Sequence, residues 1–481
     1  MSFEPVIGLE IHAQLLTKTK IFCGCSTRFG APPNTQVCPV CLGLPGALPV
    51  LNQRVVEFGT RAAHALGCTV QPVSIFARKN YFYPDLPKGY QISQYERPLA
   101  TAGRVDYESG GAARTVGITR VHMEEDAGKS LHEGFPDSDR YTYLDFNRSG
   151  VPLIEIVTEP DLRSAADASD FFSRLRAILV AIGVNDGNME EGSLRCDANV
   201  SVRPAGTATF GVKAEVKNLN SFRHVQRALE YEIARQTALV IEGGRVVQET
   251  RLWDTAAGRT VSMRSKEEAH DYRYFPEPDL PPLELDPAWI EEIRGTLPEL
   301  PDARRRRFVE QYALPEYDAG VLTQSGDVAD YFEATAAAAG NAKAASNWVM
   351  GDLMRKANED GVSLTSLPMT PTALAGLIRL VDAGTITSPV AKEVFEKMLA
   401  SGRPADVIVS AEGLARIDDD AAIEAAVRQV IESNADAVKQ YRAGKQQTFG
   451  FLVGQVMKAT RGKASPARVN ALMRSLLEST P

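Results

Sequence analysis

A carboxylate and an imidazole stand two residues apart near the start of this chain, at Glu10 and His12. They belong to the stretch VIGLEIHAQL, in which apolar residues alternate with polar ones. Such alternation is typical of a β-strand with one buried face. Side chains two residues apart on a strand point the same way, so Glu10 and His12 share a face, about 7 Å apart. Together they are suitable ligands for a divalent cation.

Three adjacent acids, Glu124 to Asp126, occur in the segment RVHMEEDAGKS. Adjacent acids repel one another unless water or a cation neutralises them. The ending GKS resembles a phosphate-binding P-loop, but that motif needs a glycine where this chain has Met123, so it is excluded. On a strand, Glu125 would face away from Glu124 and Asp126, and one face could then offer a single carboxylate.

Further predicted strands carry charges among apolar residues. Glu155 stands in the run LIEIV, where a carboxylate must be paired, bound to a metal or placed at a strand end. The stretches RCDANVSVR and VKAEVK alternate and gather charges on one face: Arg195, Asp197, Lys213, Glu215 and Lys217. Polar faces of sheets usually meet only water. Several strand faces that each combine carboxylates with Lys or Arg also suit a concave surface that binds a nucleotide. The acids would bind Mg²⁺, and the cations would bind phosphate oxygens.

Four cysteines form two close pairs, Cys23 with Cys25 and Cys38 with Cys41, with twelve residues between the pairs. Four thiolates can surround a tetrahedral Zn²⁺ and leave no open position, so the predicted zinc site is structural. Two alternatives stay open. The thiols could be unliganded, or Cys38 and Cys41 could form a redox pair, which would leave the first pair unexplained. The remaining cysteines, Cys68 and Cys196, are expected in the core.

The composition is that of an ordinary globular protein with 481 residues, 44% hydrophobic and 24% charged. This length allows two or three domains. The start MSFEPVIGLE is unlike a secretory signal, and no apolar run is long enough for a membrane helix. Six cysteines do not suggest a disulfide scaffold. We therefore expect a cytoplasmic protein without membrane contact.

The organisation changes along the chain. Residues 1–275 are rich in glycine, proline and alternating strands, with one helical pattern, FRHVQRALEYEIARQ. Five prolines then fall within Tyr274–Trp289, which predicts a domain border because proline resists both helix and central strand. Beyond it the sequence is Ala-rich and helical, and a second break is expected near Ser401–Pro404.

The last part of the chain is locally basic. The formal net charge of −8 argues against nucleic-acid binding by the whole surface. Between Ala437 and Leu477, however, there are eight basic residues and no acid. Such a patch can contact a phosphate backbone, or it can be a solvated helical face whose charges happen to segregate.

Several long blocks resemble one known family. They include IGLEIHAQL, the cysteine pairs, YFYPDLPKGYQISQY, HMEEDAGK, DFNRSGVPLIEIVTEPD, MEEGSLRCDANVSVR, KAEVKNLNSF, RSKEEAHDYRYFPEPDL and GKQQTFGFLVGQVMKATRGKASPARVN. From about residue 3 to the C-terminus the chain resembles the GatB family, which provides one of the three different chains of the heterotrimeric aspartyl/glutamyl-tRNA amidotransferase.

The resemblance implies an α+β fold. A large N-terminal cradle of antiparallel β-sheets with flanking helices would span 1–290 and include the zinc-binding loop 23–41. An all-α helical domain would span 291–404, and a YqeY-like, tRNA-binding tail domain would span 405–481.

The resemblance also implies a ligase of protein biosynthesis. ATP phosphorylates the side-chain carboxylate of misacylated Glu-tRNA(Gln) or Asp-tRNA(Asn), and ammonia then displaces the phosphate. An anionic carboxylate resists attack and has no good leaving group, and an acyl phosphate removes both obstacles. Mg²⁺ would neutralise charge during the transfer. The chain has no Gly-Gly-Ser-Ser amidase signature, so ammonia would come from the amidase (glutaminase) partner of the heterotrimer, and the small third member would wrap the pair.

The resemblance further implies roles for single residues. Glu10, His12, Glu124 and Glu125 would bind Mg²⁺, with Glu10, His12 and Glu125 catalytic, and Glu125 could also accept the proton of arriving ammonium. Lys79 and Lys88 would line the ammonia passage. Nucleotide or acceptor-end binding is expected at Glu155, Arg195, Asp197, Lys213, Glu215 and Lys217. Contacts of the tail with tRNA are expected at Lys445, Lys458, Arg461, Lys463 and Arg468.

Two alternative functions stay open from the sequence. The chain could be a non-catalytic, zinc-stabilised subunit that docks tRNA for a catalytic partner. It could also be a free-standing ATP-dependent ligase that uses ammonium directly.

Overall fold

The computed structural model describes residues 2–265, 272–417 and 419–479. The chain divides into two compact units, residues 1–302 and 303–481, and each is described by itself.

The N-terminal unit is built on a nine-stranded sheet in the order β14-β13-β12-β11-β1-β10-β7-β6-β2. Its strands are β1 (Phe3–Gln14), β2 (Thr69–Val70), β6 (Ala100–Ser109), β7 (Ala112–Glu125), β10 (Pro152–Thr158), β11 (Leu194–Pro204), β12 (Ala214–Lys217), β13 (Glu249–Asp254) and β14 (Arg259–Ser265). Neighbouring strands pair antiparallel except β12 with β13, which are parallel.

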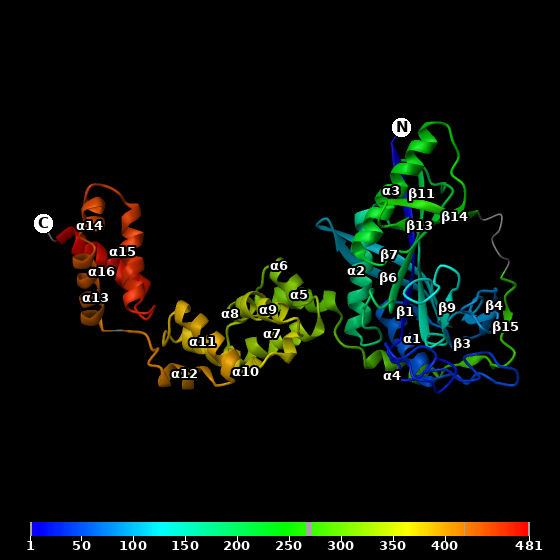
Figure 1. The fold of residues 1–481 in the computed structure, drawn as a ribbon, viewed down its shortest axis with the longest axis horizontal. Helices are drawn as coiled ribbons and strands as arrows, with labels where there is room; N and C mark the ends of the chain where they lie inside the picture. The colour runs from blue at the N-terminus through cyan, green and yellow to red at the C-terminus, as the bar shows by residue number, and fades with distance from the viewer. Residues whose placement is uncertain (1, 266–271, 418, 480–481) are drawn as a thin grey trace. The chain divides into compact units, whose positions relative to one another are not determined.

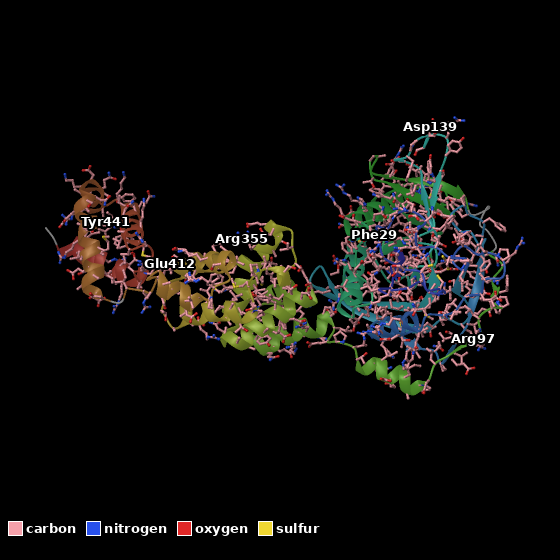
Figure 2. All side chains as sticks on the ribbon, turned by 60° about the horizontal axis from the view of Figure 1, so that its bottom comes forward. Phe29, Arg97, Asp139, Arg355, Glu412 and Tyr441 are labelled. Carbon is pink, nitrogen blue, oxygen red and sulfur yellow. The ribbon has the colours of Figure 1, made fainter. Side chains whose placement is uncertain are left out.

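One face of this sheet is apolar and packs on helices. Residues Ile7, Leu9 and Ile11 of β1 are buried in the core, as the alternation predicts. The covering helices are α1 (Gln53–Ala65), α2 (Ala165–Ala181) and α3 (Phe222–Ile241), and α4 (Pro287–Gly295) packs on α1. Figure 1 shows α2 and α3 running alongside the strands. Side chains fill the space between the layers (Figure 2).

Serine caps begin the two longest of these helices. The Ser164 hydroxyl accepts from the backbone N–H of Asp167, and the Ser221 hydroxyl accepts from that of His224. These bonds satisfy amide groups that the first helical turn leaves without a partner. The helix α3 corresponds to the one helical pattern expected within residues 1–275, but that expectation was incomplete, because α1 and α2 lie in the same range.

Smaller sheets lie beside the large one. A three-stranded sheet has the order β15-β4-β5, with β4 (Phe76–Asn80), β5 (Tyr90–Gln94) and β15 (Phe275–Pro276). The pairs β3 (Val73–Ser74) with β16 (Leu283–Glu284) and β8 (Lys129–Leu131) with β9 (Tyr143–Asp145) complete the strands. Strand β5 packs against β7, and the Gln94 side-chain oxygen accepts from the backbone N–H of Met123 at 3.1 Å. This bond fixes the smaller sheet next to Glu124.

The C-terminal unit is entirely helical in the part that the structure describes. Its elements are α5 (Pro301–Tyr312), α6 (Glu316–Leu322), α7 (Gly326–Ala339), α8 (Ala342–Trp348), the π-helix η2 (Val349–Leu353), α9 (Met354–Asp360), the 3-10 helix η3 (Leu364–Ser366), α10 (Pro371–Asp382), α11 (Ser388–Ser401), α12 (Ala405–Ala411), α13 (Asp420–Ser433), α14 (Ala435–Arg442), α15 (Gln447–Ala459) and α16 (Pro466–Ser479). The predicted fold class is confirmed, since antiparallel sheet with helices is followed by an all-helical region.

Three separate apolar clusters stabilise the chain. One fills the N-terminal unit, a second extends from Phe308 to Leu414, and a third from Ile423 to Leu477. Among the described residues, the longest apolar helices all fall short of what a bilayer crossing requires.

Candidate active site

Three adjacent strands bring acids and histidines into one row on the polar face of the large sheet. His12 of β1 lies opposite Glu155 of β10, and Glu155 lies opposite His122 of β7. Glu124 stands two residues beyond His122 and so shares its face. The row therefore results from strand order and register together.

The polar atoms of this row lie close together. His12 Nε2 is 3.6 Å from both Glu124 Oε1 and Glu155 Oε2. His122 Nε2 is 3.1 Å from Glu155 Oε2 and 3.7 Å from Glu124 Oε2. One ligand atom from each of His12, Glu124 and Glu155 falls within 4.8 Å of the others. Two carboxylates and an imidazole at this spacing fit a divalent cation.

The two acids are buried, and the histidines compensate their charge. Burial alone would raise the pKa of Glu155, but His122 and His12 hold it well below its ordinary value. Burial opposes protonation of His122, yet Glu155 and Glu124 raise its pKa to about 9. Burial also opposes protonation of His12, but its contacts with Glu155 and the charge of Glu124 raise its pKa above the ordinary value. A bound cation would meet acids that are already ionised.

A second acidic group lies next to the first on the same face. Burial, followed by the charges of Glu155 and Glu215, raises the pKa of Glu10, although Asn199 donates to its carboxylate at 2.8 Å. Lys217 Nζ lies 2.6 Å from Asp197 Oδ2 and 3.0 Å from Glu215 Oε1. The structure thus places Glu10 beside Asp197 and Glu215, two of the residues expected to bind nucleotide or the acceptor end.

Both groups open into one cavity of about 350 Å³. The smaller sheet and the segment before β15 form its other wall. The lining residues are Glu10, His12, Lys79, Ser93, Gln94, Arg120, His122, Glu155, Val157, Asp197, Asn199, Lys213, Glu215, Lys217, Thr250, Tyr272 and Tyr274. The cavity combines acids with cations and aromatic rings, as a site for a metal and an anionic substrate requires.

Glu125 does not join this group. The pleat of β7 points it to the opposite side from Glu124, where its carboxylate contacts Lys88 Nζ and accepts from the backbone N–H of Ile92 at 2.9 Å. The structure therefore does not bring Glu125 together with His12 and Glu124, as the sequence interpretation expected, and Glu155 lies beside those two residues instead. Glu155, which the sequence interpretation assigned to nucleotide or acceptor-end binding, lies at the centre of the row, between His12 and His122.

Glu125 instead faces a second cavity of about 200 Å³, which Lys88, Lys20, Cys23 and Cys41 also line. Lys79 lines the first cavity, so the two lysines expected along one passage lie in different cavities.

Arg195, which the sequence interpretation assigned to nucleotide or acceptor-end binding, contacts Asp126. Its Nη2 lies 3.0 Å from Asp126 Oδ2, and Gln14 Nε2 donates to the same oxygen at 2.9 Å. These contacts join β11 and β1 to the end of β7. Arg195 thus holds Asp126 in place next to the site.

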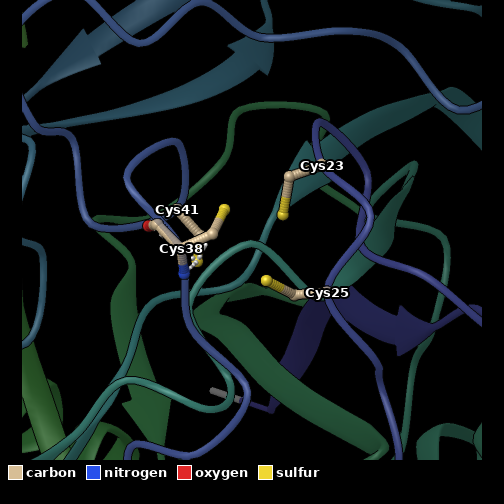
Figure 3. A group of neighbouring side chains, drawn as sticks. All are labelled: Cys23, Cys25, Cys38 and Cys41. Carbon is tan, nitrogen blue, oxygen red and sulfur yellow. Dashed lines mark hydrogen bonds between the residues drawn. The ribbon is translucent and has the colours of Figure 1, made fainter.

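The four cysteines of loop 23–41 form a separate group (Figure 3). Their sulfurs approach within 4.8 Å of one another, and none of the four is in a disulfide. The hydrogen bond with the Cys23 thiol, opposed by burial and assisted by Lys20, lowers the pKa of Cys41 to about 4. Lys20 Nζ lies 3.5 Å from Cys41 Sγ. This donor set fits a closed tetrahedral zinc site. As expected, Cys68 and Cys196 lie in the core.

The basic residues expected in the tail lie on or around α15 and α16. Lys445, Lys458, Arg461 and Arg468 are exposed, and Lys463 is half-buried. Arg468 Nη1 lies 2.8 Å from Asp420 Oδ1, so its charge is partly compensated.

The sequence interpretation missed several residues of the cavity. His122 was one, although its position two residues before Glu124 on a predicted strand was a usable signal. Arg120, Tyr272 and Tyr274 were others. The two tyrosines come from the proline-rich border and the residues just before it, which contain no local signal that would place them beside β1.

Comparison with known proteins covers nearly the whole chain. Residues 5–291 match the family described as GatB/GatE catalytic domain, and residues 330–477 match the family described as GatB domain. The chain is 58% identical over 477 residues to the B subunit of the aspartyl/glutamyl-tRNA(Asn/Gln) amidotransferase of Moorella thermoacetica, covering 99% of this chain and 100% of that protein. The protein of the same name from Trichlorobacter lovleyi is 56% identical over 477 residues, with the same coverage. The one from Carboxydothermus hydrogenoformans is 56% identical over 475 residues, covering 99% of both chains.

Proposed function

This chain belongs to the GatB family, the B subunits of aspartyl/glutamyl-tRNA(Asn/Gln) amidotransferases, and from this premise we propose that it transamidates misacylated Glu-tRNA(Gln) or Asp-tRNA(Asn). ATP phosphorylates the side-chain carboxylate of the attached amino acid, and ammonia then replaces the phosphate. The chain is in this view the ATP-using component of a ligase of protein biosynthesis.

The observation that carries the proposal is the convergence of His12, Glu124 and Glu155 beside a cavity that His12 and Glu155 line together with cations. These three residues would hold Mg²⁺, which neutralises charge on phosphate oxygens during phosphoryl transfer. Glu10, Asp197 and Glu215 extend the acidic surface along the same face. Their position suits a nucleotide that arrives with its own cation.

Cations in the cavity would orient the phosphates. Burial opposes the charge on Lys79, but Glu124 and Glu155 keep its pKa above the ordinary value, so its ammonium stays protonated. Lys79, Arg120, Lys213 and Lys217 all line the cavity. Once the carboxylate of the amino acid is phosphorylated, these groups stabilise the leaving phosphate.

Ammonia would reach the cavity along a route that includes the second cavity. Glu125 and Lys88 form a buried ion pair there, on the side of β7 away from the acid–histidine row. Ammonium must lose a proton before its nitrogen can attack, and Glu125 is the acceptor that we propose. The proton moves from NH₄⁺ to the Glu125 carboxylate, and NH₃ goes on to the acyl phosphate.

Zinc would have a structural role. Bound by Cys23, Cys25, Cys38 and Cys41, it would fix the loop that forms one wall of the second cavity. The metal would leave no coordination position for substrate.

Partners and domains follow from the family. We propose that an amidase partner supplies ammonia and that a third, small protein makes the complex a heterotrimer, which works in the cytoplasm, where aminoacyl-tRNA is made. We also propose a division into a catalytic domain (1–290), a helical domain (291–404) and a tail (405–481), which the three separate apolar clusters support. The exposed tail residues Lys445, Lys458 and Arg461 would contact the tRNA body through phosphate.

The test is Glu155→Gln in the reconstituted heterotrimer, with ammonium chloride as nitrogen donor. This change keeps the size of the side chain but removes a cation ligand. We expect formation of the acyl phosphate and of the amidated tRNA to fall by about a hundredfold or more. The matched control is Glu291→Gln on the exposed surface of α4, which should behave as wild type. Normal amidation by Glu155→Gln would assign the chemistry to a partner and leave this chain a docking subunit.

A further inference from the structure

Four tyrosine rings form a continuous series beside the catalytic cavity, which two of them line, and we call this series the tyrosine ladder. Tyr81 and Tyr272 lie with ring centroids 6.0 Å apart, edge to face, and so do Tyr272 and Tyr274. Tyr274 and Tyr95 are stacked, 4.2 Å apart and 5° from parallel. The rings come from three separate segments, those that follow β4 and β5 and the one that precedes β15.

Cations lie against the rings of the ladder. Lys79 Nζ is 5.0 Å from the centroid of Tyr272 and 5.9 Å from that of Tyr81. The Arg120 guanidinium carbon is 5.9 Å from the centroid of Tyr95. Lys79 and Arg120 both line the catalytic cavity. Aromatic rings interleaved with cations are characteristic of surfaces that bind single-stranded nucleic acid.

The ladder leads from the cavity to the protein surface. Tyr272 and Tyr274 line the cavity, whereas Tyr95 is 46% exposed. Beyond the Tyr95–Tyr274 pair is a hollow of about 80 Å³, bordered by Arg97, an exposed residue labelled in Figure 2. An aromatic surface with one end at the acids and the other in solvent can guide a flexible polymer to the reacting atoms.

We propose that the tyrosine ladder binds the single-stranded 3′ end of the aminoacyl-tRNA, with its last bases stacked on Tyr272, Tyr274 and Tyr95. This rests on the proposed function, because the amino acid at that end is the group to be amidated. Bases at an unpaired RNA end are free to stack on aromatic side chains, whatever their sequence. Lys79 and Arg120 would face the phosphates between them.

The length of the ladder favours RNA over the adenine of ATP. A mononucleotide has one base and needs one or two rings, but the ladder has four rings and continues to the exposed Tyr95. Several successive bases at an RNA terminus can stack on several rings of the ladder at once. The adenine of ATP is the alternative occupant that the experiment must distinguish.

The experiment uses the assembled heterotrimer and two tRNA ligands, intact tRNA(Gln) and the same tRNA without its 3′-terminal adenosine. For the wild type, loss of the adenosine should weaken binding by roughly tenfold, the effect of one base–ring stack. Tyr272→Leu and Tyr95→Leu should bind intact tRNA about tenfold more weakly. Tyr272→Leu should no longer distinguish the two ligands. Tyr272→Phe and Tyr95→Phe, which keep the ring, should bind as wild type.

The matched control is Tyr317→Leu, at a tyrosine that is 76% exposed on α6 of the helical unit. It should change nothing. If the leucine variants instead raise the KM for ATP about tenfold and keep their tRNA affinity, the ladder holds adenine and the proposal is wrong. Unchanged tRNA affinity and ATP kinetics would also overturn it, and the exposed Tyr95 supplies this test even if Tyr272→Leu folds poorly. Failure of the proposed function would be visible separately, as a wild-type complex that binds tRNA but does not amidate it.

Discussion

Glu155 Oε2 lies 3.1 Å from His122 Nε2 and 3.6 Å from His12 Nε2, so one buried carboxylate on β10 is held between histidines of both neighbouring strands. His122 is the closer of the two. Although burial lowers its pKa, the charges of Glu155 and Glu124 raise that pKa to about 9, and this favours the protonated form of His122. The histidine that the sequence interpretation overlooked is thus the nearest partner of the central acid.

Replacing His122 by alanine should destabilise the N-terminal unit. The negative charges of Glu124 and Glu155 would then lack the neighbouring imidazolium of His122. Breaking such a buried ion pair costs about 3 kcal/mol of unfolding free energy. Mg²⁺ should restore part of this stability, because a cation between the acids replaces the lost charge. Denaturant unfolding with and without Mg²⁺ measures both effects. The control His132→Ala removes an exposed histidine and should be neutral; equal behaviour of the two variants would refute the pairing.

Glu125→Gln should separate the two half-reactions. Because Glu125 faces the second cavity rather than the acid–histidine row, its neutral replacement should leave formation of the acyl phosphate intact. Loss of the proton acceptor should lower amidation at least a hundredfold. Trapping the acyl phosphate without ammonia, and then assaying with ammonium, resolves the steps. A loss of acyl phosphate equal to that of Glu155→Gln would return Glu125 to the metal site.

Removing zinc should release the loop 23–41. Cys41→Ser is expected to lower bound zinc from about one ion per chain to near zero, since a tetrahedral site depends on all four thiolates. The loop should then become sensitive to protease, because metal binding and folding are coupled. Elemental analysis and limited proteolysis measure the two outcomes. Cys68→Ala, at a core cysteine outside the cluster, should keep its zinc.

The helical unit should lose part of its stability in acid through Glu333. Arg307 Nη1 lies 2.6 Å from Glu333 Oε1 and Arg304 Nε lies 3.0 Å from Oε2. Burial would raise the pKa of Glu333, but the hydrogen bonds from both arginines lower it below 4.5. A lowered folded-state pKa gives stability that is present above the unfolded pKa and lost as pH falls through the folded one.

Glu333→Gln should therefore cost about 2 kcal/mol at pH 7 and progressively less below about pH 4.5. Unfolding curves of the two proteins at several pH values measure the difference. The control Glu359→Gln, at an exposed ion pair, should change stability by less than about 0.5 kcal/mol. A difference that stays constant down to pH 2 would contradict the lowered pKa.

Neutralising Lys445, Lys458 and Arg461 together should weaken tRNA binding without affecting amidase-driven glutamine hydrolysis. Each lost phosphate contact lowers the slope of log affinity against log salt concentration by about 0.7 to 0.9. Three such contacts predict a fall of roughly two to three in that slope. Lys392→Ala on the helical domain, at another exposed lysine, serves as control. An unchanged slope would mean that the basic stretch is only a solvated face.

Much of this protein could be predicted from local sequence patterns. The period of two along VIGLEIHAQL and RCDANVSVR predicted which residues share a face, because backbone geometry alone sets that period. The spacing of Cys23, Cys25, Cys38 and Cys41 predicted a single cluster, because the short segments between these residues keep the two pairs close together. Proline density predicted the change from sheet to helices.

The composition of the site depended on tertiary structure. That β10 lies between β1 and β7 is a matter of long-range pairing, and this order made Glu155 central and brought His122 beside it. Alternation along β7 already predicted that Glu125 faces away from Glu124, but only the packing of distant segments placed it against Lys88 and the second cavity. The tyrosine ladder is the extreme case, because its rings come from segments almost two hundred residues apart. Local geometry determines which way a side chain points, but only the packing of distant strands determines what it meets there.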